Sequence, residues 1–98
     1  MEAYEQFKSR YPAGVLFFRL GEDYAAFFDD AKLVSSAFDL PLEYGGPCRD
    51  IPVISLDECL FKVNLNKLLR DGFEVVVVEQ IGARDIIKTF SPGKTKAG

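Results

Sequence analysis

The sequence has 98 residues, of which 48% are hydrophobic and 28% are charged, with 12 lysines and arginines against 15 aspartates and glutamates. It contains no histidine, which excludes imidazole bases, histidine-dependent nucleophiles and ordinary zinc sites. A chain of this length buries about two thirds of its unfolded surface, enough for one core but not for an additional deep cofactor cleft. We therefore expect one domain that binds other molecules, with no catalytic activity and no cofactor.

The first part of the chain predicts a helix, a strand and a second helix. Aromatic residues at helical spacing predict a helix over 2–10 that ends before Pro12, because the residue ahead of a proline favours extended geometry. The apolar run 15–20 is typical of a central strand that is buried on both faces. An apolar stripe then predicts a helix over about 24–38, with Asp23 as its N-cap.

The second part predicts short strands, a helix and two further strands. Proline and glycine surround two short strands, expected at 42–44 and 51–55. Asp57 is the expected N-cap of a helix that stops at an Asp-Gly pair. Four consecutive valines predict a buried strand over 73–81, and 85–90 predicts a last strand. Strands that alternate with helices predict an α/β fold with helices packed on a sheet.

Charge divides the chain into an acidic body and a basic end. Residues 1–83 hold 14 acidic and 8 basic residues, a net charge of −6, whereas residues 84–98 carry +3. The proline, glycine and lysine content of the end predicts a module over 1–91 followed by a basic flexible tail over 92–98. That tail is either a linker to other domains or a frayed terminus.

Cysteine usage predicts reduced thiols, and hydropathy predicts neither a membrane span nor a signal peptide. Cys48 and Cys59 form no metal-binding or disulfide pattern, so we expect reduced, part-buried thiols. No stretch reaches the roughly 20 apolar residues of a membrane span, and the N-terminus has no apolar run of a signal peptide. The expected compartment is the cytoplasm, without membrane association.

Two acidic pairs form the densest polar feature, Glu22-Asp23 and Asp29-Asp30. Such carboxylates can bind a divalent cation or transfer protons. A structural role is favoured, because Glu22 and Asp23 would lie at a helix N-terminus and Asp29 would pair with Lys32 on the solvent face. We therefore predict neither a catalytic residue nor a metal site.

Phosphate-binding signals are weak. The glycine-rich segments lack the pattern of a Walker motif, and the acidic body disfavours nucleic acid. Arg84, Lys88, Lys94 and Lys96 form the one basic cluster. On these residues alone a solvated tail is favoured over contact with DNA phosphates.

Three blocks of sequence carry a resemblance to a known family: LFFRLGEDYAAFFDDAK, LLRDGFEVVVVEQIG and the closing SPGKT. In order and spacing the chain resembles, from about Tyr4 to Thr95, the N-terminal domain of the MutS family of DNA mismatch-recognition proteins. The resemblance implies a small mixed β-sheet with helices packed on it, and contact with mismatched DNA from the minor-groove side.

The recognition motif of that family is degenerate in this chain. Members carry G-D-F-Y-E, in which the phenylalanine inserts at the mispaired base and the glutamate hydrogen-bonds it. Here 21–25 reads GEDYA, so Asp23 occupies the phenylalanine position and Ala25 the glutamate position. Tyr24, one residue further along the predicted helix, would be rotated by about 100° and would not replace the wedge. Glu43 is also acidic where members often carry basic residues.

The resemblance implies a DNA-binding module of a larger DNA-processing protein in mismatch repair, with weak or absent mismatch discrimination. The degenerate site would comprise Asp23, Tyr24 and Ala25, with the basic cluster as candidate contacts to the backbone of non-specific double-stranded DNA. The expected partners also include other domains of a longer polypeptide. The alternative is a protein-interaction or structural domain that keeps the fold without binding DNA.

Overall fold

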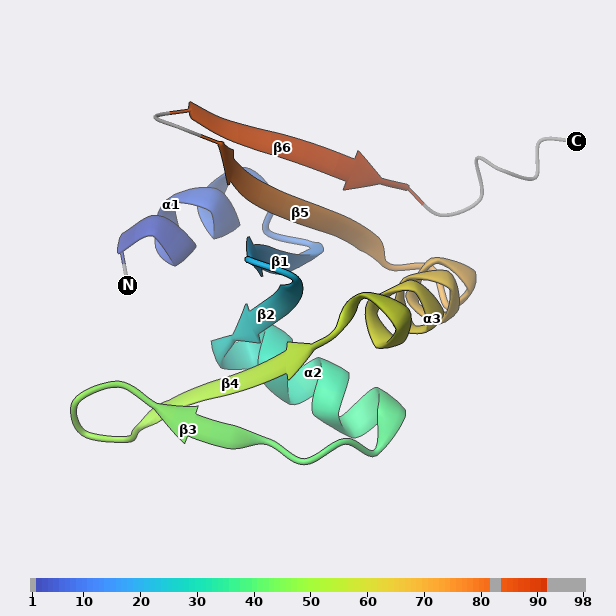
Figure 1. Ribbon diagram of the computed structural model, residues 1–98. Coiled ribbons are helices and arrows are strands. Elements are labelled where there is room, and N and C mark those ends of the chain that lie inside the picture. The colour runs from blue at the N-terminus through green and yellow to red at the C-terminus, as the bar shows by residue number, and fades with distance from the viewer. Residues whose placement is uncertain (1, 82–83, 92–98) are drawn as a thin grey trace, which may run out of the picture.

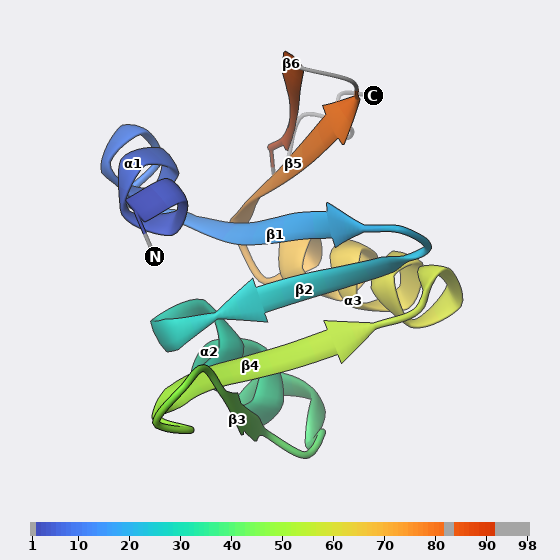
Figure 2. The same cartoon turned by 60° about the vertical axis from the view of Figure 1, so that its left-hand side comes forward.

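The protein folds into a six-stranded sheet with helices on both faces (Figures 1 and 2). The structure is a computed structural model and describes residues 2–81 and 84–91. The elements are α1 (Glu2–Arg10), β1 (Gly14–Leu20), β2 (Asp23–Phe27), α2 (Phe28–Phe38), β3 (Glu43–Gly45), β4 (Ile51–Leu56), α3 (Glu58–Arg70), β5 (Glu74–Ile81) and β6 (Arg84–Phe90). The strand order is β3-β4-β2-β1-β5-β6. Strands β1 and β5 are parallel and the other neighbours are antiparallel, so the predicted α/β fold with a mixed sheet is confirmed.

The four valines of β5 show how the sheet separates two cores. Successive side chains of a strand point to opposite faces. Val75 and Val77 accordingly pack with residues of α2 and α3, while Val76 and Val78 pack with residues of α1. One face is thus covered by two helices, whereas the other is covered by a single nine-residue helix.

The β1 strand begins in the core and ends in solvent. Val15, Leu16 and Phe17 are buried, as the sequence predicts for a central strand. Leu20, however, is 58% exposed, because α1 packs near the start of β1 and does not reach its end. The prediction of burial on both faces is therefore correct only for the first part of the strand.

Residues 23–27 form a strand, which corrects the predicted helix over 24–38. They pair with β1 on one side and with β4 on the other. The helix begins only at Phe28, whose φ of 56° reverses the chain direction directly after β2. A left-handed residue of this kind costs about 1–2 kcal/mol outside glycine. The Phe28 ring packs 4.9 Å from that of Tyr4, and this contact offsets part of the cost.

The predicted cap of the third helix is confirmed. The Asp57 carboxylate accepts a hydrogen bond of 2.8 Å from the backbone N–H of Leu60. Phe61 and Leu68 face the core from α3. After the helix, Gly72 takes a φ of +96°, a conformation that L side chains rarely adopt.

The remaining sequence predictions divide into confirmed, corrected and untested ones. The short strands β3, β4 and β6 lie within one residue of the predicted positions. Cys48 and Cys59 are free but exposed, not part-buried as predicted, because one lies in the β3–β4 turn and the other in the first turn of α3. The predicted tail over 92–98 lies outside the described residues. No described helix is long and apolar enough to cross a membrane.

A buried carboxylate fastens α1 to the rest of the fold. Asp30 in α2 is only 4% exposed. Its oxygens accept hydrogen bonds from the Tyr4 hydroxyl (3.0 Å), the Lys8 ammonium (2.8 Å) and the backbone N–H of Leu16 (3.2 Å). Lys8 also donates to the carbonyl oxygen of Gly14. Three elements, α1, β1 and α2, therefore meet at one charge.

Tyr4 makes the stability of the fold depend on pH in the alkaline range. Burial, together with the negative charge of Asp30, raises the pKa of the Tyr4 hydroxyl well above its ordinary value. The folded state then holds this proton more tightly than the unfolded state, whose tyrosine pKa is about 10. The stabilisation is present below about pH 10 and is lost as pH rises further, by up to about 1.4 kcal/mol per pH unit.

We expect the free energy of unfolding of the wild type to exceed that of Tyr4→Phe below about pH 10, and the difference to shrink above it. Urea denaturation of both proteins across this range measures the difference. Lysine titration contributes equally to the unfolding free energies of the wild type and of Tyr4→Phe, so it cancels in their difference. A difference that stays constant with pH would contradict the assignment to Tyr4.

Candidate functional site

The two residues at the family's phenylalanine and glutamate positions share one face of the sheet. In β2, Asp23 and Ala25 are two positions apart, so both project to the side on which α1 packs. Asp23 is exposed and lies opposite Leu20 of β1, while Ala25 lies opposite Phe18 and is 2% exposed. Because the segment is a strand, Asp23 and Ala25, which are two positions apart, present their side chains on the same surface.

Tyr24 faces the other way and belongs to the core. Its ring stacks on that of Phe61 from α3, with centroids 3.9 Å apart and planes at 7°. The Arg19 guanidinium lies 5.1 Å from the Tyr24 ring centroid. The sequence prediction used a helical rotation of about 100° to separate Tyr24 from its neighbours. The strand makes that separation about 180°, since neighbouring side chains alternate.

The described part of the basic cluster lies on β6. Arg84 and Lys88 are both exposed and, being four residues apart on a strand, project to the same face. Lys88 pairs with Glu79 at 3.5 Å, and Glu79 also pairs with Arg19 at 3.5 Å. Lys94 and Lys96 lie outside the described residues.

The two acidic pairs are separated and serve different purposes. Glu22 and Asp23 lie in the β1–β2 connection and at the start of β2, so neither is part of a helical first turn, which corrects the predicted role in capping. Asp29 is exposed at the start of α2, whereas Asp30 is the buried carboxylate described above. Within 2–81 and 84–91, no group of three or more metal-binding side chains is assembled.

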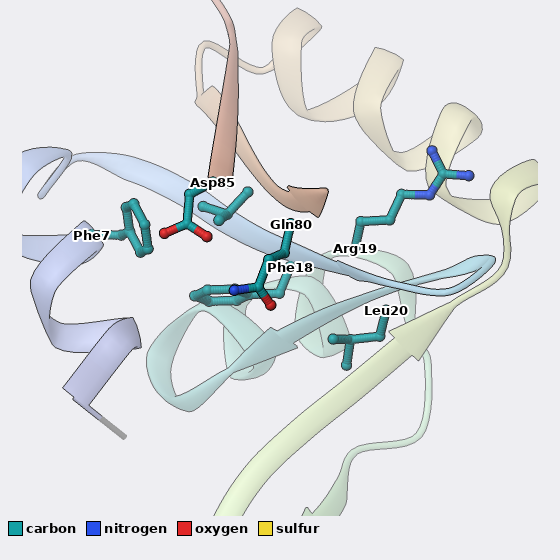
Figure 3. Close-up of a pocket in the computed structure, with 7 residues that line it drawn as sticks. Phe7, Phe18, Arg19, Leu20, Gln80 and Asp85 are labelled. Atoms are coloured by element: carbon teal, nitrogen blue, oxygen red, sulfur yellow. The ribbon is translucent and has the colours of Figure 1, made fainter. Parts of the chain in front are cut away.

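A hollow at the end of β1 is a feature that the sequence analysis did not find. It has a volume of about 190 Å³ and lies on the α1 face (Figure 3). Its lining residues are Phe7, Phe18, Arg19, Leu20, Val78, Gln80 and Asp85. The signal in the sequence was the shortness of the first helix, since nine residues cannot cover the face of a six-stranded sheet.

The acidic position on β3 is also at the surface. Glu43 is exposed, and its neighbour Tyr44 is 52% exposed. Both lie on the strand at one edge of the sheet. Asp23 and Glu43 are therefore both accessible to solvent. They are the two acidic residues at positions where the resemblance implies an aromatic and a basic side chain.

Comparison with known proteins places this arrangement in a family. Proteins named DNA mismatch repair protein MutS are similar over 95% of the chain: the one from Pseudothermotoga lettingae is 36% identical over 102 residues, that from Salinibacter ruber 31% over 105, and that from Acholeplasma laidlawii 30% over 100. The chain spans 12% of the length of each of these relatives. A family model described as MutS domain I matches residues 1–97. Because this match covers almost the whole chain and agrees with the mixed sheet, the chain belongs to the MutS domain I family.

Proposed function

We propose that this chain is the DNA-binding N-terminal module of a larger mismatch-repair protein, and that it discriminates mismatched from paired DNA weakly or not at all. The observation that carries the proposal is the exposed carboxylate of Asp23 at the position of the family's phenylalanine. An aromatic wedge gains stacking energy at a kinked, mismatched step. A carboxylate offers no ring for stacking and is repelled by the phosphates.

Ala25 supports the same proposal from the second position of the motif. A glutamate there would supply an acceptor to the mispaired base, but the alanine methyl group has no hydrogen-bonding atom. It also packs beside Phe18 and is 2% exposed, so it presents almost no surface. Both chemical groups that would distinguish a mismatch are thus replaced.

Non-specific affinity for double-stranded DNA would come from the basic cluster. Arg84 and Lys88 project from one face of β6, and Lys94 and Lys96 follow within ten residues in the sequence. Contacts of lysine and arginine with phosphates carry no sequence information and weaken steeply with salt. In this proposal the chain has no catalytic role of its own. It acts together with further domains of a longer polypeptide, since its relatives are much longer than this chain. Residues 92–98 serve as the linker, and the compartment is the cytoplasm.

Fluorescence anisotropy with a paired duplex and a G·T duplex, at low and moderate salt, tests the proposal. We expect equal affinities for the two duplexes, within about threefold, and a loss of affinity as salt rises. Binding to the G·T duplex that is tighter by about tenfold, or about 1.4 kcal/mol, would refute the assignment of Asp23 and Ala25. Absence of binding at low salt would favour the alternative, a protein-interaction domain that keeps the fold.

Restoring the motif separates these two functions further. If DNA approaches the face of the sheet on which Asp23 and Ala25 lie, the double variant Asp23→Phe with Ala25→Glu should gain preference for the G·T duplex. If the fold is only a scaffold, the same change should create no preference. Asp50→Phe, at an exposed position in the β3–β4 turn, is the matched control for an added surface ring.

A further inference from the structure

The hollow at the end of β1 combines aromatic walls with a carboxylate. Phe7 and Phe18 meet edge to face with centroids 6.1 Å apart, and Leu20 and Val78 complete the apolar wall. The Asp85 carboxylate projects from β6 toward the Phe7 ring (Figure 3). In the part of the chain that the structure describes, Asp85 forms no ion pair.

Two exposed carboxylates, those of Asp85 and Asp23, lie at the hollow, against one guanidinium, that of Arg10, which lies 5.9 Å from the Phe7 ring centroid. Arg19 lines it through its base, but the guanidinium extends away from it, over Tyr24 and toward Glu79 on the opposite face (Figure 3). Asp23 lies beside Leu20 as its cross-strand partner and adds a second exposed carboxylate. A site of this charge attracts a cation and repels the phosphates of nucleic acid.

The size of the hollow restricts what can occupy it. At about 190 Å³ it is smaller than the roughly 300–1,000 Å³ of typical cofactor and ligand pockets. It has room for a side chain, whose apolar stem would cover Leu20 and Val78. Such an occupant would remove exposed apolar surface from water at about 25 cal/mol per Å².

We propose that this hollow binds an arginine side chain presented by a partner protein. A guanidinium stacks on aromatic rings and forms paired hydrogen bonds with a carboxylate, which the compact ammonium of lysine does not. Phe7, Phe18 and Asp85 supply both kinds of group within one site. The chain holds its own Arg19 with the same chemistry, a tyrosine ring at 5.1 Å and a glutamate at 3.5 Å.

The arginine site shares the α1 face with Asp23 and Ala25 but lies on the opposite face of the sheet from the described part of the basic cluster. Asp85 is one residue from Arg84 on β6, so the two side chains project to opposite faces of the sheet. Lys88 shares the face of Arg84 and pairs with Glu79 there. A partner protein in the hollow and a duplex along the basic cluster would therefore bind different surfaces.

Titration of the isotope-labelled chain, followed by NMR amide shifts, tests this proposal without DNA. The probe is N-acetyl-arginine methylamide, and the matched probes are the lysine and citrulline analogues, of which citrulline is a neutral isostere. We expect saturable shifts confined to Phe18, Leu20, Gln80 and Asp85 with arginine, weaker ones with lysine and none with citrulline. Equal shifts with citrulline, or shifts spread over the chain, would overturn the proposal.

Two variants and a control assign the binding to these residues. Asp85→Asn should weaken arginine binding about threefold, the change expected for an exposed ion pair. Leu20→Ala should weaken it by removing the wall, while Asp50→Asn, an exposed acid in the β3–β4 turn, should leave it unchanged. Equal effects of Asp85→Asn and Asp50→Asn would overturn the proposal. A short DNA duplex that shifts the same amides, more strongly in Asp85→Asn, would assign the hollow to nucleic acid instead.

Discussion

Replacing Asp30 with alanine should lower the free energy of unfolding by about 3–5 kcal/mol, the range for breaking a buried ion pair from one side. The carboxylate accepts hydrogen bonds from Tyr4, Lys8 and Leu16, and all three donors would lose their partner together. The Lys8 ammonium would also lose its counter-charge at 2.8 Å while its side chain is three-quarters buried. The cost is large because the donors belong to α1 and β1, and the carboxylate in α2 connects both elements to the rest of the fold.

Urea denaturation of Asp30→Ala against Asp29→Ala measures this effect. Asp29 is the neighbouring residue, has the same side chain and is exposed. Its replacement should cost under about 1 kcal/mol, the size of a charge effect in the first turn of a helix. Asp30→Asn should lie between the two, since it keeps an oxygen acceptor but loses the charge. Similar costs for Asp29→Ala and Asp30→Ala would contradict the role of the buried network.

Replacing Tyr24 with alanine should cost about 3–5 kcal/mol, as for other large aromatic side chains in a core. The Tyr24 ring stacks on that of Phe61 and contacts the Arg19 guanidinium, so its loss leaves a cavity between β2 and α3. Such a cost identifies Tyr24 as part of the core, although its neighbours Asp23 and Ala25 occupy the positions of the family's recognition motif.

The matched control for this variant is Tyr44→Ala. Tyr44 is the same residue type on an edge strand and is 52% exposed, so its replacement should cost under about 1 kcal/mol. Tyr24→Phe keeps the ring and should stay close to the wild type in stability and in affinity for duplex DNA. Equal costs for Tyr24→Ala and Tyr44→Ala, measured by thermal or urea denaturation, would show that the stacked geometry contributes no stability.

The motif illustrates how far a resemblance can be carried without tertiary structure. Aligning GEDYA with the family motif correctly separates Asp23 and Ala25 from Tyr24. The helical geometry assumed for them is wrong, because a five-residue segment that contains two alanines carries too little periodicity to distinguish helix from strand. In the structure the segment has strands on both sides, and these pairings decide its conformation.

The acidic pairs show a second limit. In the sequence Asp29 and Asp30 are neighbours of the same type, and the sequence analysis predicts a place for Asp29 alone, on the solvent face of a helix. The structure buries Asp30 because α1 brings Tyr4 and Lys8, 26 and 22 residues away in sequence, against the same carboxylate. No local pattern contains the positions of those distant donors.

The sequence by itself determined the features that depend on neighbouring residues. These are the valine strand β5, the buried start of β1, and the Asp57 cap and Asp-Gly stop of α3, together with membership of the family. Tertiary structure alone decided that β2 is a strand, that Asp30 is buried and that the end of β1 opens into a hollow. The physical reason is that these features depend on which distant segments pair or cover one another, and a nine-residue helix leaves part of one sheet face uncovered.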